Sequence, residues 1–206
     1  MNKETILVIN CGSSSLKFSL ICPNTGETIL NGLAECLSTP QASIKIKYES
    51  DKQSFELLSP FSHQTAILSL VDFLEEKNLS QTVQAIGHRI VHGGEKYAQP
   101  TLITADVKAE ISELSKLAPL HNPANLTGIE ASEKSFKGLP QVAVFDTAFH
   151  QSMPKKAYIY GLPYNLYEEH GIRRYGFHGT SHCFVAEQAA KILEKPLETC
   201  NFISAH

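Results

Sequence analysis

The segment with the clearest chemical potential is the polar turn Asn10-Cys-Gly-Ser-Ser-Ser-Leu-Lys17, which follows an apolar run that ends at Ile9. Hydroxyl, amide and ammonium groups, together with the backbone amides of a glycine-containing turn, can converge on an anion such as a phosphate. The segment lacks both the Gly-x-x-x-x-Gly-Lys-Ser/Thr spacing and the following helix of a Walker-type loop. It therefore predicts either a phosphate-binding β-hairpin or a plain Gly/Ser hairpin turn.

The elements around this turn read as consecutive strands. Apolar alternation predicts strands over Thr5–Asn10, Leu16–Cys22 and Thr28–Glu35, and the short turns between them carry Gly or Pro, which is typical of an antiparallel meander. Ser43–Tyr48 alternates polar and apolar residues and pairs plausibly with Ser54–Leu58 as a solvent-facing hairpin.

The rest of the chain alternates helices and strands, which favours a mixed α/β sheet. We expect helices at Thr65–Glu76, Ala105–Leu117, Pro123–Phe136 and His182–Leu193, and strands at Val83–Val91, Val142–Phe145 and Phe202–Ala205. Asn122 is the expected N-cap of the third helix, with Pro123 at its first position. The last strand would stop at His206 without a returning helix, so we expect the chain to be the front part of something longer.

Composition narrows the classes of protein that are possible. The 206 residues are 42% hydrophobic and carry a formal net charge of -3, which suits a folded protein and gives no reason to expect nucleic acid or an anionic membrane as a partner. No apolar run is as long as a spanning helix, and no secretory signal is recognised. The five cysteines are scattered without a Cys-x-x-Cys pair, which favours free thiols in a reducing cytosol.

Polar residues recur at the predicted strand ends and in the turns that follow them. They are Asn10 to Lys17, Arg89 with His92 to Glu95, Asp146 to His150, and His206. In open α/β sheets ligands bind at strand ends, so these segments are candidates for one common site.

Five blocks, in order along nearly the whole chain, resemble the acetate kinase family. They are Asn10-Cys-Gly-Ser-Ser-Ser-Leu-Lys17, His88-Arg-Ile-Val-His-Gly-Gly-Glu95, Leu117-Ala-Pro-Leu-His-Asn-Pro-Ala-Asn125, Phe145-Asp-Thr-Ala-Phe-His150 and Tyr175-Gly-Phe-His-Gly-Thr-Ser-His182. The resemblance implies a ribonuclease-H-like lobe of the actin/hexokinase/Hsp70 ATPase superfamily, with three antiparallel strands followed by parallel ones. Residues 1–206 would form the N-terminal lobe, with a small hairpin insertion near 36–60, and the C-terminal lobe would be absent.

The resemblance also implies roles in nucleotide and metal binding. Asn10 would contribute to a magnesium site, since Mg²⁺ takes few protein oxygens and keeps waters and phosphates. Lys17 would bind ATP, with Ser13 and Ser15 facing the phosphates. His206 would open a phosphate loop that reads His-Leu-Gly-Asn-Gly in the family, of which only the His is present here.

For the substrate, the resemblance implies that Arg89 holds the carboxylate. A salt bridge to an acidic residue such as Glu95 is the alternative. The substrate methyl would lie among Val91, Leu120 and Phe177, for which core packing is the alternative, and His121 would face the same pocket. Such an apolar wall discriminates only weakly between carboxylate substrates of different chain length, because one methylene contributes about 1–3 kcal/mol to binding.

Two further residues would be catalytic by the same resemblance. His178 would stabilise the transition state of phosphoryl transfer. Asp146 matches the active-site aspartate, yet acetate is already ionised at neutral pH, because such carboxylic acids have a pKa near about 4.3. We therefore expect Asp146 to act through magnesium and its waters, or to orient Arg89, and not as a general base.

The remaining histidines are expected to be structural. His178 and His182 are four apart, a spacing that can bind zinc on a helix, but a third ligand is not evident. His182 is expected to be packed or capping, and His63 and His170 to lie at the surface.

The implied activity is reversible, magnesium-dependent transfer of the ATP γ-phosphoryl to acetate, giving acetyl phosphate and ADP by direct in-line attack. The family further implies a cytoplasmic homodimer that forms largely through the missing lobe, so the isolated chain would be weakly active or inactive. The alternatives are a propionate or butyrate kinase, and a non-catalytic module that binds carboxylate or phosphate.

Overall fold

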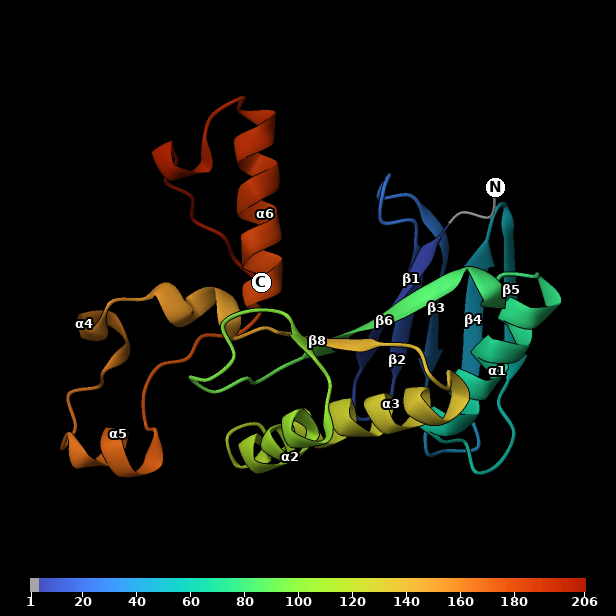
Figure 1. Cartoon of the computed structure of the whole chain (residues 1–206), viewed down its shortest axis with the longest axis horizontal. Helices are drawn as coiled ribbons and strands as arrows, with labels where there is room; N and C mark the ends of the chain where they lie inside the picture. The colour runs from blue at the N-terminus through green and yellow to red at the C-terminus, as the bar shows by residue number, and fades with distance from the viewer. Residues whose placement is uncertain (1–3) are drawn as a thin grey trace. The chain divides into compact units, whose positions relative to one another are not determined.

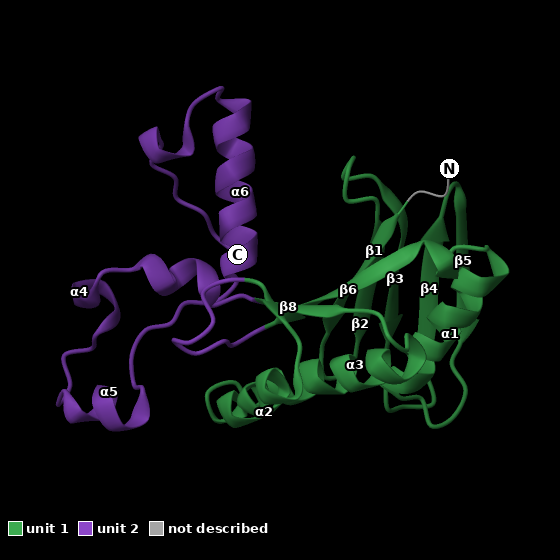
Figure 2. Cartoon of the chain, viewed as in Figure 1, with its two compact units in different colours: residues 1–90, 100–144 green, residues 91–99, 145–206 purple. Residues whose placement is uncertain are grey.

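The computed structural model describes residues 4–206, so the expected lack of a secretory signal falls partly outside the described residues. The chain forms two compact units (Figures 1 and 2). Unit 1 comprises Met1–Ile90 and Pro100–Val144, and unit 2 comprises Val91–Gln99 and Phe145–His206.

Unit 1 is built on a mixed sheet, which confirms the predicted fold class. Its strand order is β5-β4-β3-β2-β1-β6-β8-β7. The strands are β1 (Thr5–Cys11), β2 (Leu16–Ile21), β3 (Thr28–Glu35), β4 (Ser43–Tyr48), β5 (Asp51–Glu56), β6 (Val83–Ile90), β7 (Thr101–Leu102) and β8 (Gln141–Phe145).

The predicted three-stranded meander is confirmed, and it extends through the next hairpin. Strands β1 to β5 pair antiparallel in sequence order, whereas β6 pairs parallel with β1. The register places Asn10 opposite Lys17 and Ile9 beside His88. Because β1 and β6 are parallel, their carboxyl ends lie at the same edge of the sheet.

The core of unit 1 lies between the sheet and helices α1 (His63–Glu76) and α3 (Asn122–Ser135). Alternate residues of the strands point into it, among them Leu7, Leu20 and Leu30. The hairpin that was expected to face solvent contributes as well, because Ile44 and Ile46 of β4 are buried. The solvent-facing expectation is therefore wrong for one face of β4, although β5 is mostly exposed.

The helix ends in unit 1 differ by a few residues from the expectations. Helix α1 begins at His63, because the Ser62 hydroxyl accepts the amide of Thr65 at 3.2 Å. Helix α2 (Ala105–Glu113) ends four residues early and continues as a 3-10 turn over Leu114–Lys116.

Asn122 is not the N-cap of α3. His121 occupies that position without a side-chain cap bond, and the Asn122 amide donates to the carbonyl of Ile111 at 3.2 Å. Farther along α3, a Cβ at Gly128 would lie 2.7 Å from the Cβ of Cys11. Only glycine lets this helix approach the end of β1 so closely.

Unit 2 contains two short helices and one longer helix, joined by irregular segments. They are α4 (Lys155–Tyr158), α5 (Asn165–His170) and α6 (Gly179–Ile192). Helix α6 begins three residues before the expected start at His182. The predicted strand over 202–205 is wrong, because residues 201–206 have no regular structure.

Within residues 4–206, no helix combines the length and the apolar character needed to cross a membrane. All five cysteines are free thiols.

Candidate functional site

The strand ends of unit 1 bring three predicted site residues together. Asn10 lies near the end of β1, Arg89 near the end of β6, and Lys17 pairs with Asn10 from β2. The Arg89 guanidinium donates from Nη1 to Asn10 Oδ1 at 3.3 Å. An amide oxygen, a guanidinium and an exposed ammonium group therefore share one edge of the sheet.

The turn between β1 and β2 is held by backbone hydrogen bonds. The Gly12 amide donates to the carbonyl of Ser15 at 2.9 Å, and the amide of Leu37 donates to the carbonyl of Ser14 at 3.0 Å. The side chains of Ser13 and Ser14 are exposed, and Ser15 is half-buried. The turn is thus fixed by its backbone while its hydroxyls remain accessible.

Two buried side chains support this turn and were not recognised as doing so from the sequence. His63 Nε2 lies 2.7 Å from the Gly12 carbonyl oxygen, and Asn125 Nδ2 donates to the Cys11 carbonyl at 2.8 Å. The expectation that His63 lies at the surface is wrong, because it is 7% exposed. The sequence feature that could have indicated this role is the position of His63 directly after Ser62, a helix-capping residue. His170 is exposed, as expected.

Leu120 and His121 lie just before α3 and have exposed side chains, with Leu120 76% exposed. Core packing, the alternative for Leu120, is therefore excluded within unit 1.

In unit 2, Asp146 follows β8 and is attached to the start of α6. Its carboxylate oxygen Oδ1 accepts the Thr180 hydroxyl at 2.9 Å, and its carbonyl accepts the Gly179 amide at 3.0 Å. A Cβ at Gly179 would lie 2.0 Å from that carbonyl oxygen, so glycine is required for this approach. The positive end of the helix favours a negative charge at buried Asp146.

His178 immediately precedes α6 with a left-handed backbone at φ 54° and ψ 28°. This conformation is uncommon outside glycine and is typical of functional sites. Its ring stacks on that of His206, with centroids 4.0 Å apart and planes 12° apart. His206 also hydrogen-bonds to Ser181 Oγ at 2.9 Å, and His182 is bonded to Ser204 Oγ at 2.8 Å.

The two apolar residues predicted to contact the substrate from unit 2 differ in their exposure to solvent. Val91 is buried, whereas Phe177 is 50% exposed. The Phe177 ring lies 6.1 Å from the His92 ring, and His150 donates to the Phe177 carbonyl at 3.0 Å. Phe177 is thus positioned through its backbone while its ring stays accessible.

Glu95 belongs to a network within unit 2. Its carboxylate pairs with Arg173 and accepts the Tyr167 hydroxyl at 3.0 Å. Arg173 is buried and its guanidinium lies 3.6 Å from the centroid of Tyr158. Hydrogen bonds to Tyr158 and Glu95 raise the pKa of Tyr167 to about 12.

Two buried histidines near the strand ends are neutral at pH 7. Burial lowers the pKa of His88 to about 4, and the ring shares a 2.5 Å hydrogen bond with Gln141 Oε1. Burial also lowers the pKa of His92 to about 4. His92 Nδ1 accepts the Gly94 amide at 3.0 Å, which fixes the neutral tautomer protonated on Nε2.

The predicted site residues therefore form two groups. Unit 1 carries Asn10, Ser13, Ser15, Lys17, Arg89, Leu120 and His121, and unit 2 carries Val91, Asp146, Phe177, His178 and His206. Within the groups, direct contacts join Asn10 to Arg89 and His178 to His206.

The unit 1 group fits a magnesium ion that is held mostly by phosphates and water. Asn10 Oδ1 accepts one long bond from Arg89, and an amide oxygen has two lone pairs. Across residues 4–206, no cluster of three His, Cys, Asp or Glu side chains has the arrangement of a metal site. Mg²⁺ does not need such a cluster, because it is usually bound through one or two protein oxygens and its substrate.

A mixed sheet with hydroxyl, amide and cationic groups at its strand ends defines an α/β protein of the kind that binds ligands at that edge. A model of the acetokinase family matches residues 5–206. The chain belongs to the acetokinase family.

Several known proteins are similar to this chain. An acetate kinase of Shewanella sp. strain ANA-3 is 54% identical over 208 residues, which cover 100% of this chain and 52% of the relative. A solved propionate kinase of Francisella tularensis matches with a TM-score of 0.89 and 47% identity, over 93% of this chain and 50% of that one. A solved acetate kinase of Porphyromonas gingivalis matches with a TM-score of 0.86 and 42% identity, over 94% of this chain and 50% of that one. The chain spans about half the length of these relatives.

Proposed function

We propose that this chain carries the acetate-binding and part of the ATP-binding machinery of an acetate kinase, which transfers the ATP γ-phosphoryl reversibly to acetate. The observation that carries the proposal is the pairing of Arg89 with Asn10 beside Lys17 at the strand ends. A guanidinium grips a carboxylate through two parallel bonds, and a lysine neutralises phosphate as a point charge.

The reaction needs no covalent enzyme intermediate. A carboxylate oxygen of acetate forms a bond to the γ-phosphorus, the bond from phosphorus to the β,γ-bridging oxygen breaks, and its electron pair leaves with ADP. Because the acetate is already ionised, no proton has to be removed. Positioning and charge neutralisation then provide most of the catalysis.

Each group of residues has a part in this scheme. Arg89 orients the attacking oxygen, Lys17 with Ser13 and Ser15 binds the phosphates, and His178 donates to the equatorial oxygens. His206 begins a further phosphate-binding segment.

The remaining residues position the metal and the methyl group. Asn10 holds Mg²⁺, which neutralises phosphate charge when bound, and Asp146 orients its waters or Arg89. Val91, Leu120 and Phe177 each contribute apolar contacts to the methyl group of the substrate, and His121 contributes to substrate binding.

A cytoplasmic enzyme of organic acid metabolism, which makes acetyl phosphate on the way to acetyl-CoA, is part of the proposal and is supported by the relatives. A homodimer formed through residues outside this chain is part of the proposal. Because the relatives are about twice as long, we expect residues 1–206 alone to turn over weakly or not at all.

The test combines acetate binding with product formation. The chain is incubated with Mg²⁺, ATP and acetate, acetyl phosphate is trapped as the hydroxamate, and acetate binding is measured separately by saturation-transfer NMR. Arg89→Ala should weaken acetate binding roughly 10- to 100-fold and remove any product, whereas the matched variant Arg174→Ala, at an exposed arginine, should preserve both. Equal acetate binding by the two variants would contradict the proposal.

A propionate kinase is the second candidate, because a solved propionate kinase is among the structures most similar to this chain. Comparing acetate, propionate and butyrate in the same binding assay decides between them. Tighter binding of propionate than of acetate would favour this second candidate.

A further inference from the structure

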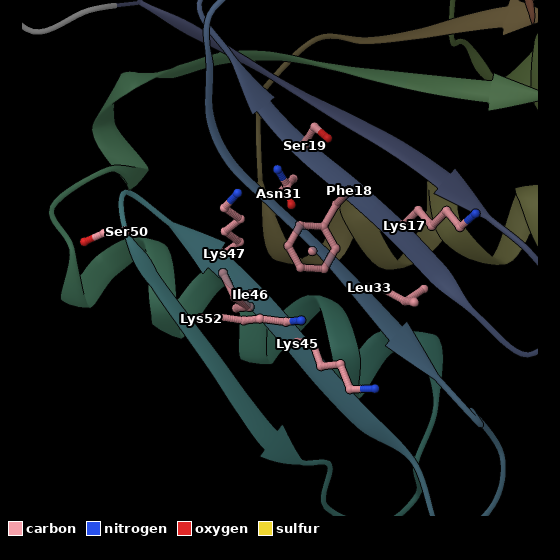
Figure 3. Close-up of a pocket in the computed structure, with 11 residues that line it drawn as sticks. Lys17, Phe18, Ser19, Asn31, Leu33, Lys45, Ile46, Lys47, Ser50 and Lys52 are labelled. Atoms are coloured by element: carbon pink, nitrogen blue, oxygen red, sulfur yellow. The ribbon is translucent and has the colours of Figure 1, made fainter.

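A second cationic surface lies on the face of the meander that is turned away from α1. A cavity of about 690 Å³ there is lined by Lys17, Lys45, Lys47 and Lys52, together with polar Ser19 and Asn31. Figure 3 shows the lysines spread over β2, β4 and β5, with residues of β3 between them. We call this cavity the lysine groove.

Strand register explains how the groove forms. Ser19, Asn31, Lys47 and Lys52 occupy directly opposed positions on four consecutive strands. Since opposed residues on adjacent strands point to the same side of a sheet, these four side chains make one continuous row of hydrogen-bond donors. A second row brings Lys17 and Lys45 to the same face, on either side of Leu33.

Most of the positive charge in the groove is not balanced by ion pairs within residues 4–206. Lys45 pairs with Glu35, whereas Lys17, Lys47 and Lys52 have no ion pair with any residue in 4–206. None of the described residues that line the groove is acidic. Glu27 and Glu49 border a separate hollow together with Lys47.

The cross-strand pair of Lys47 and Lys52 is the most informative detail. Like charges placed directly opposite on neighbouring strands destabilise a sheet. At this position the chain carries two lysines instead of a lysine and an acid. An anion bound between them would convert this repulsion into two charge-assisted contacts.

We infer that the lysine groove binds a compact anion of several linked phosphates. Neighbouring strands are about 4.8 Å apart, so the backbones of Ser19 and Lys52, at the two ends of the first row, are separated by about 14 Å. A linear triphosphate carries anionic oxygens along its length, so it can contact more of the donors in this row at once than a single phosphate can. The inference does not rest on the proposed catalytic site, because Lys47 and Lys52 have no role there.

The test is an NMR titration of the ¹⁵N-labelled chain with tripolyphosphate, without magnesium and at constant ionic strength. Saturable shifts are expected at the amides of Asn31, Lys47 and Lys52. The amides of the β1–β2 turn, Gly12 to Ser15, report separately on phosphate binding at the proposed catalytic site, so failure of one site is distinguishable from failure of the other.

The decisive comparison uses two double variants with the same change in charge. Lys47→Gln/Lys52→Gln should weaken binding in the groove at least about tenfold, because two charge-assisted contacts are lost. Lys134→Gln/Lys137→Gln, at exposed lysines elsewhere in unit 1, should change it less than about twofold. Equal weakening by both pairs, or shifts confined to residues 12–15, would overturn the inference.

Discussion

The two units hold their polar residues by different means. In unit 1, Asn10, Lys17 and Arg89 are positioned by the register of three paired strands above a buried core. In unit 2, Asp146 and Glu95 are held by side-chain and capping hydrogen bonds between short, irregular segments. Side chains positioned by register should therefore be replaceable without loss of folding stability. Replacing the hydrogen-bonded side chains of unit 2 should lower the stability of that unit.

The largest effect is expected at the register-positioned Arg89. Arg89→Ala should lower acetate affinity by roughly 10- to 100-fold, since hydrogen bonds to a charged group contribute about 1.5–3 kcal/mol. Because Arg89 is only half-buried, the free energy of unfolding should change by less than about 1 kcal/mol. Acetate titration and urea unfolding measure the two quantities.

Arg89→Lys refines this comparison. It retains the charge but loses the bidentate fork, so acetate affinity should be intermediate. A large loss of stability in Arg89→Ala would show that register alone does not hold the site.

The opposite outcome is expected at Glu95. Glu95→Ala leaves the buried guanidinium of Arg173 without its carboxylate. Breaking a buried ion pair costs about 3–5 kcal/mol, and partial exposure of Glu95 reduces this to about 2 kcal/mol. Hydrogen exchange should increase in residues 145–178 and remain unchanged in β1 to β3.

The matched control is Glu169→Ala, at an exposed carboxylate that pairs with the exposed ring of His170. In this variant, the hydrogen-exchange rates of both units should equal those of the unsubstituted chain. Equal exchange in the Glu95 and Glu169 variants would contradict the proposed coupling.

Much of unit 1 could be predicted from its sequence because its signals are periodic. Alternating apolar residues and short turns located β1 to β3, and those strands bring Asn10 beside Lys17. The support from His63 was missed, because a single histidine at a helix start gives no periodic signal. Unit 2 offers little such periodicity, so the network of Glu95 and Arg173 is visible only in three dimensions.

The next expected effect is a dependence of folding stability on pH, to which each unit contributes one buried histidine, His88 in unit 1 and His92 in unit 2. His88 and His92 have pKa values near 4 when folded, against an ordinary value of 6.5. Between these values the unfolded chain binds protons that the folded chain excludes, so stability is full above pH 6.5 and declines as the pH falls. For His88 we expect a loss of about 1–2 kcal/mol between pH 7 and pH 5.

Urea unfolding at several pH values measures the slope of the unfolding free energy against pH. His88→Gln should flatten it, and His170→Gln, at an exposed histidine, should not. A slope that is unchanged in His88→Gln would assign the pH dependence to other groups.

A smaller effect is expected from the side chain that holds the end of β1. Asn125→Ala removes the donor to the Cys11 carbonyl and leaves this buried acceptor with one partner fewer, which should cost about 1–2 kcal/mol. Phosphate affinity at the β1–β2 turn should fall with it. Asn201→Ala, at an exposed asparagine, is the control, and equal unfolding free energies in the two variants would contradict the supporting role.

The smallest effect concerns backbone conformation at His178. Both His178→Ala and His178→Gly remove the ring that stacks on His206, so the difference between them isolates the left-handed backbone. Glycine adopts this conformation without strain, whereas alanine does not. After allowance for the greater freedom of glycine in the unfolded chain, the glycine variant should be more stable by about 0.5–1 kcal/mol. If alanine is as stable as glycine, residue 178 relaxes at little cost, and the start of α6 is not fixed by the contacts of Asp146 with Gly179 and Thr180.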